Sequence, residues 1–300
     1  MISIKNIVIP GSYSDISLFL KHLKFYKKYL NYSNIVLIAP SNASTLLSND
    51  TSFSFIPEES ILSKNTINEY LLKMRAVTTK RNGWYLQQFI KMAYARICKK
   101  KYYLIYDIDT IPIKQIKMFE NNKPYFDMKI GHDSLYFETM NLLIPKLRFS
   151  NWCYVTEHML IKTVLMKNLL DAIEINYKLP GKFFWEKILM AIDLKYMNGN
   201  GFSEYETYGC YVDTKYPNIY IHREWHSKRN AKSYFGSSDN LKEEYINWLS
   251  QYYNALTFER YHIFDEEYFE IIKENRLRKK YNPKKFFEKF NNPSKRELLQ

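Results

Sequence analysis

Two aspartates one residue apart, at the end of an apolar run, are the residues of this sequence best suited to chemistry. The run Tyr102–Tyr106 directly precedes Asp107 and Asp109, which predicts a buried strand that ends at the acidic pair. Side chains alternate along a strand, so both carboxylates project from the same face. Adjacent carboxylates repel each other unless a cation lies between them, and their hard oxygen atoms suit Mg²⁺ or Mn²⁺. A metal held there would bridge a diphosphate.

The elements around this pair follow the pattern of a doubly wound α/β sheet. We expect strands over Ile4–Pro10, residues 34–39 and residues 52–56, with a turn over residues 11–15 and a helix that ends at Tyr29. Open α/β sheets bind ligands at the carboxyl ends of their strands, where the acidic pair would lie. The first strand is followed by neither a dinucleotide-binding glycine motif nor a P-loop, which removes those two interpretations.

Residues 83–100 predict a long helix that leads directly into the acidic strand. Trp84, Gln88 and Lys91 share its polar face at helical spacing, so this face could look into the site. Lys91 or Arg81 would then meet phosphate. The alternative is that Trp84 and the glutamine only tie the helix to a loop.

A second acidic segment follows later in the chain. After strand-like pieces through Met140 and helices over residues 159–173 and 183–195, the glycine-containing turn 198–201 precedes Ser203, a good helix N-cap. Glu204 and Glu206 fall in the first turn of that helix. They are candidates for chemistry or simply charges that the helix dipole favours. Residues 218–222 predict a short strand that ends at His222.

Composition favours one large α/β domain or a domain plus an appendage, because 46% of the 300 residues are hydrophobic. Three widely spaced cysteines form neither a disulfide framework nor a metal knuckle, which fits a reducing cytoplasm. We expect no signal peptide, because the first ten residues lack a long apolar core. No run of 18 apolar residues predicts a membrane span.

The formal charge of +13 is concentrated near the end of the sequence. Residues 276–296 contain nine basic residues and one acidic residue, with phenylalanines interleaved among the lysines. Such a segment could adhere to an anionic bilayer, or it could be a solvated helix or a disordered end. We expect no nucleic-acid partner, because the rest of the chain has no comparable basic stripe.

In this order the motifs resemble the GT-A fold glycosyltransferases, which transfer a sugar from a nucleotide donor. The matching pieces are residues 4–15, the D-x-D at Asp107 and Asp109, the glycine turn, the acidic helix start and His222. More narrowly, residues 83–91 (GWYLQQFIK) and 202–206 (FSEYE) are similar to bacterial surface-polysaccharide and lipooligosaccharide glycosyltransferases. The resemblance covers residues 1–230. It implies an α/β, Rossmann-like GT-A fold with a mostly parallel central sheet flanked by helices. We expect a catalytic domain over residues 1–240 and a helical, basic C-terminal extension over residues 241–300.

The resemblance also assigns roles. Asp107 and Asp109 would hold Mn²⁺ or Mg²⁺, with His222 completing the metal shell and His226 as the alternative histidine. Glu204 or Glu206 would take the proton of the acceptor hydroxyl in an inverting enzyme. The helix starts E-Y-E where the family has E-D, so the choice between them stays open. The nucleotide-diphosphate sugar, with a UDP-sugar favoured, would be bound by Pro10, Gly11, Ser12, Asp15, Arg81, Trp84, Gln88, Lys91, Asp107 and Gly201.

The implied protein is a hexosyltransferase-like enzyme that acts on a glycan or glycolipid acceptor. It would work in the cytoplasm, held on the inner face of the membrane by the basic segment. Two other classes stay open. Residues 107–110 (DIDT) also look like the aspartate motif of haloacid-dehalogenase-type phosphatases, although those proteins place it near the N-terminus and need a later acidic pair. A non-enzymatic protein that binds a membrane surface or a polyanion is the second.

Overall fold

The structure, a computed structural model, describes residues 4–47, 51–131, 135–149 and 152–291. The chain forms two compact units, each built from several segments. The first unit contains the residues up to Ile16, Tyr32–Asp107 and Lys117–Trp225. The second contains Ser17–Asn31, Ile108–Ile116 and the residues from His226 onward.

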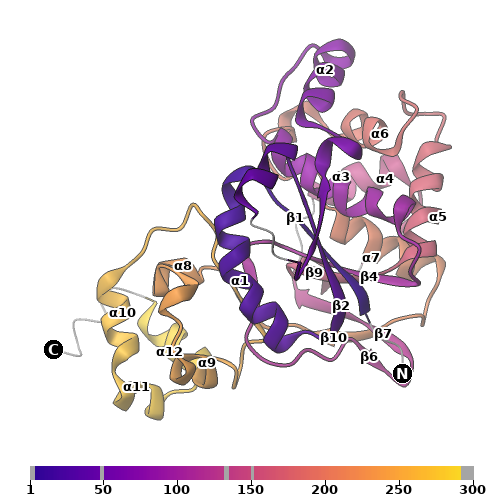
Figure 1. Ribbon diagram of the computed structural model, residues 1–300. Coiled ribbons are helices and arrows are strands. Elements are labelled where there is room, and N and C mark those ends of the chain that lie inside the picture. Colours follow the sequence, from indigo (N-terminus) through magenta and orange to yellow (C-terminus); the bar gives the residue numbers. More distant parts are fainter. Residues whose placement is uncertain (1–3, 48–50, 132–134, 150–151, 292–300) are drawn as a thin grey trace. The chain divides into compact units, whose positions relative to one another are not determined.

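A five-stranded sheet in the order β3-β2-β1-β4-β9 is the centre of the first unit (Figure 1). The first four strands of this order are parallel, and β9 is antiparallel to β4. Their bounds are β1 Ile4–Pro10, β2 Tyr32–Ala39, β3 Ser54–Pro57, β4 Tyr102–Tyr106 and β9 His158–Lys162. All five residues of β4 are buried, as the unbroken apolar run of a central parallel strand requires.

The helices of the first unit cover this sheet and enclose one large hydrophobic core rich in tyrosine and phenylalanine. Helix α3 packs against β1 and α5 against β9. The helix bounds are α2 Lys64–Arg75, α3 Asn82–Ile97, α4 Leu135–Leu143, α5 Thr163–Glu174, α6 Phe184–Ala191 and α7 Glu204–Lys215. The predicted mixed α/β fold, with a mostly parallel sheet and flanking helices, is therefore confirmed.

A smaller sheet completes the first unit. Strand β7 pairs in parallel with β10 and antiparallel with β6 and β8. The bounds are β6 Phe119–Glu120, β7 Lys123–Ile130, β8 Trp152–Cys153 and β10 Ile221–Glu224. Short 3₁₀ turns lie at Tyr13–Asp15, Ser41–Leu46, Glu58–Ser60 and Leu194–Tyr196.

The second unit is largely helical and has its own aromatic core. Its sheet has the order β11-β12-β5. The bounds are α1 Ile16–Tyr29, β5 Thr110–Pro112, β11 Ser227–Lys228, α8 Ala231–Phe235, a 3₁₀ turn Ser238–Asn240, α9 Glu243–Leu249, β12 Ala255–Thr257, α10 Glu266–Lys273, α11 Asn275–Lys280 and α12 Pro283–Phe290. The last segment of the second unit begins at His226, and the unit also includes α1 and β5. The expected boundary between a catalytic domain and a C-terminal extension at residue 240 stays a prediction.

Three expectations about local structure are wrong. Residues 159–162 belong to strand β9 and not to a helix, because they pair with β4 residue by residue, from Tyr102↔Lys162 to Tyr106↔His158. Residues 135–140 are helical in α4 and are not strand-like, since α4 packs its apolar side into the core. Strand β10 starts at Ile221 rather than at residue 218, where the backbone takes a left-handed conformation.

The basic C-terminal segment forms helices α11 and α12, and residues 292–296 lie outside the described residues. The aromatic side chains of α12 do not face outward. Phe286, Phe287 and Phe290 are 0%, 3% and 0% exposed in the core of the second unit. Among the described residues, no helix combines the length and the apolar character needed to cross a bilayer.

Candidate active site

The strand order of the first unit reverses direction between β1 and β4. We call the carboxyl ends of these two neighbouring strands the β1–β4 edge. The chain runs outward from β1 to β2 and β3 on one side, and places β4 on the other. In open α/β sheets, ligands bind at such a reversal, beyond the carboxyl ends of the strands. Ile7 pairs with Leu104 and Val8 with Ile105, so continuing this register brings Pro10 level with Asp107. The predicted donor loop and the first aspartate of the D-x-D therefore share this edge.

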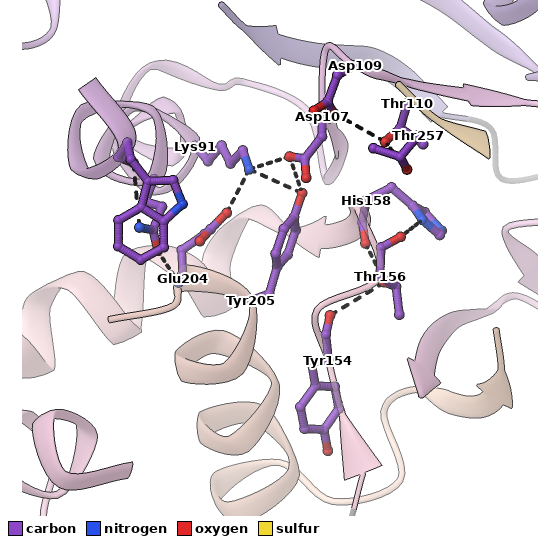
Figure 2. Close-up of polar contacts among 12 residues, drawn as sticks. Lys91, Asp107, Asp109, Thr110, Tyr154, Thr156, His158, Glu204, Tyr205 and Thr257 are labelled. Atoms are coloured by element: carbon purple, nitrogen blue, oxygen red, sulfur yellow. Dashed lines mark hydrogen bonds and ion pairs between the residues drawn. The ribbon is translucent and has the colours of Figure 1, made fainter. Parts of the chain in front are cut away.

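A buried lysine joins Asp107 to Glu204 (Figure 2). The Nζ atom of Lys91 lies 2.5 Å from Asp107 Oδ1 and 2.8 Å from Glu204 Oε1. The hydroxyl of Tyr205 donates to the same Asp107 oxygen at 2.9 Å. We call Lys91, Asp107, Glu204 and Tyr205 the Lys91 cluster. Its members come from α3, the end of β4 and the start of α7, so three elements meet at one ammonium group.

The Lys91 cluster carries two carboxylates for one cation. Burial alone would lower the pKa of Lys91, but Asp107 and Glu204 outweigh it and hold that pKa above its usual value. Burial raises the pKa of Glu204, and the neighbouring ammonium opposes that effect. The side chains of Lys91 and Glu204 are 7% and 4% exposed, whereas that of Asp107 is 28% exposed. Asp107 is thus the most exposed carboxylate of the cluster.

The start of α7 is held in place by its own cap and by α3. The hydroxyl of Ser203 accepts a hydrogen bond from the Glu206 N–H, as the sequence predicts for an N-cap. The Glu204 N–H donates to Gln88 Oε1 at 3.1 Å. Gln88 lies on the same face of α3 as Lys91, and its hydrogen bond holds the start of α7, the helix that carries Glu204.

Glu206, the other candidate base, has different surroundings. It is fully buried, and its Oε1 accepts the Tyr154 N–H at 2.8 Å. Burial, followed by the neighbouring Glu206, raises the pKa of the Cys153 thiol to about 12. Glu206 therefore contacts the segment before β9, whereas Glu204 contacts Asp107 through Lys91.

Arg81 is bound to the predicted glycine turn. Its Nη1 donates to the Gly199 carbonyl at 2.8 Å and to Asn200 at 3.1 Å. The guanidinium also lies over the Trp84 ring, 3.9 Å from its centroid. At Gly201 a side chain would come within 2.6 Å of Ile192, so this position requires glycine for packing. The structure brings these residues together, while their role toward a donor stays a prediction.

The loop after β1 is closed by Asp15. Its Oδ2 accepts the Ser12 N–H at 2.8 Å and the Ser12 hydroxyl at 2.6 Å. The Gly11 N–H donates to the Ile38 carbonyl. Asp15 thus shapes the loop that carries Pro10, Gly11 and Ser12 at the β1–β4 edge.

Asp109 belongs to the second unit, whose boundary follows Asp107. The backbone on both sides of its side chain is held by α1: His22 Nδ1 lies 3.0 Å from the Ile108 carbonyl, and the Tyr26 hydroxyl donates to the Thr110 carbonyl at 2.9 Å. The Asp109 carbonyl accepts the Phe258 N–H. Its role as a metal ligand stays a prediction.

His222 pairs with a carboxylate outside the Lys91 cluster. Its Nε2 lies 2.8 Å from Asp213 Oδ2, and the Tyr154 hydroxyl donates to the same carboxylate. The hydrogen bond to Asp213 raises the pKa of His222, against a smaller effect of burial. The alternative histidine, His226, belongs to the second unit, where it stacks on Tyr252. A metal-ligand role for either histidine stays a prediction.

A second buried charge cluster was not anticipated from the sequence. His158 Nε2 lies 2.9 Å from Asp127 Oδ2. The Arg223 guanidinium donates to Asp127 Oδ1 at 2.6 Å and to Oδ2 at 2.9 Å. The other ring nitrogen of His158 lies 2.9 Å from the Thr156 carbonyl, so both ring nitrogens contact a polar oxygen. We call Asp127, His158 and Arg223 the Asp127 cluster.

The carboxylate oxygen of Asp107 is the kind of ligand that suits a hard divalent cation. Within the described residues, no three His, Cys, Asp or Glu side chains gather as a metal-binding group. Mg²⁺ in nucleotide sites is commonly held by one or two carboxylates, with the remaining ligands supplied by phosphates and water. The accessible Asp107 carboxylate fits one protein ligand of such a site.

This chain belongs to a family described as a family of unknown function, DUF6492, whose sequence profile matches residues 3–291. No curated protein sequence matches it.

Three solved structures illustrate what the fold is similar to. Mouse xyloside xylosyltransferase 1 has 10% identity and a TM-score of 0.46, covering 87% of this chain and 99% of that chain. Galactosyltransferase LgtC, in complex with donor and acceptor sugar analogues, has 10% identity and a TM-score of 0.38, covering 84% and 86%. Glycosyltransferase GlyE of Streptococcus pneumoniae has 12% identity and a TM-score of 0.38, covering 94% and 61%. All three are glycosyltransferases, the class that the sequence resembles. Because all three TM-scores are below 0.5, no residue role is taken from these structures. The roles proposed below are argued from the side chains of this protein.

Proposed function

We propose that this protein is a glycosyltransferase that moves a sugar from a nucleotide-diphosphate sugar to a hydroxyl group of a glycan acceptor. The observation that carries the proposal is the accessible Asp107 carboxylate at the β1–β4 edge, joined through Lys91 to Glu204. Together with the sequence resemblance, it supports a site that handles a diphosphate next to a second acidic group.

The donor would lie along the carboxyl ends of β1 and β4. The loop of Pro10, Gly11 and Ser12 lies at this edge, and the resemblance implies that it contacts the nucleotide. The ammonium of Lys91 would lie beside the diphosphate, and the bound metal would offset the negative charge that Asp107 and Glu204 leave in excess. A UDP-sugar is our first choice of donor.

Asp107 and Asp109 would hold the Mn²⁺ or Mg²⁺ ion, with His222 as a further ligand that the resemblance implies. When bound, this ion would act as a Lewis acid that offsets negative charge on the nucleoside diphosphate. The residues of the chain supply the rest: Lys91 orients Asp107, and Tyr205 donates a hydrogen bond to the same carboxylate.

Glu204 is our first choice for the group that accepts the proton of the acceptor hydroxyl in an inverting reaction. It lies in the Lys91 cluster next to Asp107, whereas Glu206 is occupied by the Tyr154 N–H. To act as a base, Glu204 must stay ionised, and the ion pair with Lys91 favours its charged form. A retaining reaction would leave Glu204 as the partner that positions Lys91.

The acceptor class follows from the narrower resemblance and is a bacterial surface polysaccharide or lipooligosaccharide. We further propose attachment to the inner face of the cytoplasmic membrane through the exposed lysines of α11 and α12. Because the phenylalanines of α12 are buried, charge and not insertion of aromatic rings would hold the protein there.

The first experiment is a thermal-shift screen of nucleotides and nucleotide sugars with Mn²⁺ or EDTA. Ligand at a hundred times its Kd adds about 2.7 kcal/mol to the free energy of unfolding. We expect one nucleoside diphosphate to stabilise wild type in a metal-dependent manner and Asp109→Asn to lose this shift. Asp171→Asn, on the exposed side of α5, is the matched control. Wild type that responds to no nucleotide would contradict the proposal and direct attention to the phosphatase class.

Membrane attachment has its own test. Deleting residues 276–300 would remove buried core residues of the second unit, so charge reversal is the better perturbation. Lys280→Glu, Lys284→Glu and Lys285→Glu together should release the protein from vesicles that contain phosphatidylserine. Equal sedimentation of wild type and this variant at 0.15 M salt would contradict attachment through these lysines.

A further inference from the structure

The second unit contains a pocket that the proposed transfer reaction does not use. It has a volume of about 580 Å³, within the range typical of small-molecule sites. Its walls come from α9, the turn after α9, and α11 with the two residues that follow it. The lining residues are Glu244, Asn247, Trp248, Gln251, Asn275, Arg278, Lys279, Tyr281 and Asn282.

Two large buried side chains form a fixed part of this α9–α11 pocket. Trp248 is 5% exposed, and its indole N–H donates to the Tyr281 carbonyl at 3.0 Å. Arg278 is 7% exposed and donates to the Ile272 carbonyl and to Glu244. Both side chains are hydrogen-bonded within the second unit, so this part of the wall is ordered before any ligand arrives.

Four polar side chains of the pocket are exposed and unpaired. Asn247, Gln251, Asn275 and Lys279 make no hydrogen bond or ion pair to another described residue. Each amide offers both a donor and an acceptor. Such groups match the neighbouring hydroxyls of a sugar, which also donate and accept.

The charge of the pocket selects among polyhydroxylated ligands. Glu244 and Arg278 lie 3.1 Å apart and compensate each other. Lys279 has no such partner and leaves one uncompensated positive charge at the rim. An anionic group is therefore favoured over a cationic one.

We propose that the α9–α11 pocket binds a saccharide that carries a carboxylate or phosphate group. Asn247, Gln251 and Asn275 bind its hydroxyls, and Lys279 binds its anionic group. The identification of this saccharide as part of the acceptor glycan rests on the proposed function, whereas the binding itself does not.

The test is calorimetric titration of the full chain with four probes: a hyaluronan tetrasaccharide, mannose 6-phosphate, neutral maltotetraose and inorganic phosphate. We expect at least one acidic saccharide to bind about tenfold more tightly than maltotetraose and inorganic phosphate, since a hydrogen bond to a charged group contributes about 1.5–3 kcal/mol. The two acidic probes separate a carboxylate from a phosphate ligand.

Matched variants locate the binding. Lys279→Gln and the double variant Asn247→Ala/Gln251→Ala should each weaken binding of the acidic saccharide about tenfold. Lys280→Gln changes the next residue of α11, an equally exposed lysine outside the pocket lining, and should leave the Kd unchanged. Equal weakening by Lys279→Gln and Lys280→Gln would show general attraction to a basic helix and overturn the proposal.

Failure of the pocket and failure of the proposed function give different results. Metal-dependent donor binding without binding of either acidic saccharide would overturn the pocket and keep the glycosyltransferase. Saccharide binding that Lys279→Gln weakens, in a protein that binds no nucleotide sugar, would support the pocket and contradict the transferase.

Discussion

The Lys91 cluster and the Asp127 cluster use the same kinds of side chain in opposite proportions. In the first, one ammonium lies between two carboxylates; in the second, one carboxylate lies between an arginine and a histidine. The Asp107 side chain is 28% exposed, whereas that of Asp127 is 4% exposed. Arg223 is further bound to the Lys117 carbonyl. The first cluster therefore keeps an accessible carboxylate and an excess of negative charge for a ligand, while the accessible member of the second is the Arg223 guanidinium, which is also 28% exposed.

This difference teaches that buried charge alone does not mark a functional site. Both clusters are costly to desolvate and both depend on complete pairing. What separates them is the charge of the member that stays accessible, a carboxylate in the first cluster and a guanidinium in the second. Each prediction below tests that distinction.

The largest expected effect is that of Lys91→Met. It leaves two carboxylates without their cation and should lower the free energy of unfolding by about 3 kcal/mol, measured by urea unfolding, with loss of donor binding. Lys187→Met is the control, because Lys187 is equally buried but donates to the carbonyls of Asn176 and Leu179. It should reduce stability and spare donor binding. Donor binding retained in Lys91→Met would break the comparison.

Asp127→Asn should reduce stability by a similar amount, about 3 kcal/mol, because the Arg223 guanidinium loses its counter-charge. The folded fraction should bind donor as wild type does, since the Asp127 cluster takes no part in the site. Urea unfolding and thermal shift with the donor measure the two properties separately. A donor Kd that rises with Asp127→Asn would assign the second cluster to the site as well.

Glu204→Gln should reduce sugar transfer about a hundredfold with little change in donor binding, the size expected for loss of a general base. Glu206→Gln keeps an acceptor for the Tyr154 N–H and should leave transfer close to wild type. Initial rates and donor Kd values for the two variants form the measurement. A larger loss of transfer in Glu206→Gln would reverse the choice of base.

The two clusters should respond to opposite ends of the pH scale. His158 and Arg223 overcome the effect of burial and lower the pKa of Asp127, so its contribution is present above the ordinary value of 3.8 and is lost as pH falls through the lowered pKa. The pKa of Lys91 is raised, so its contribution is present below 10.5 and is lost as pH rises through the raised pKa.

Urea unfolding across pH measures both responses. Asp127→Asn should flatten the acid limb of the stability curve and leave the alkaline limb, and Lys91→Met should do the reverse. Identical curves for the two variants would contradict the assignment of the limbs.

The smallest effect concerns the half-exposed pair His222–Asp213, which is intermediate between the two clusters. Asp213→Asn removes the hydrogen bond that raises the pKa of His222 and should return that pKa toward 6.5. Because the His222 side chain is 46% exposed, stability should change little. Proton NMR titration of the imidazole measures the shift. An unchanged pKa would mean that Asp213 does not control this histidine.

The sequence predicted the parts of the site that depend on local pattern. Strand β4, its acidic end, the polar face of α3 with Lys91 and the Ser203 cap all follow from periodicity and cap chemistry. The Asp127 cluster could not be predicted in this way, because its residues come from β7, β9 and β10 and meet only through strand pairing. The local pattern predicts a helix over residues 159–162 for the same reason: their pairing with β4 is a tertiary contact that outweighs local propensity.

The α12 phenylalanines illustrate a similar limit. The interleaved lysines and phenylalanines are compatible with a segment that adheres to a bilayer, yet helical spacing places Phe286, Phe287 and Phe290 together on one buried side. Whether such a stripe meets a membrane or a protein core depends on partners far away in the sequence.

The segmented make-up of the second unit has a consequence for synthesis on the ribosome. Helix α1 and strand β5 are translated early, but most of their core partners lie after residue 225. Apolar side chains such as Phe25, Tyr29 and Ile111 must therefore wait for about a hundred further residues or more, a delay of several seconds at ordinary translation rates. During that interval the nascent chain exposes hydrophobic surface that chaperones recognise, so newly made protein should depend on them more than its modest size suggests.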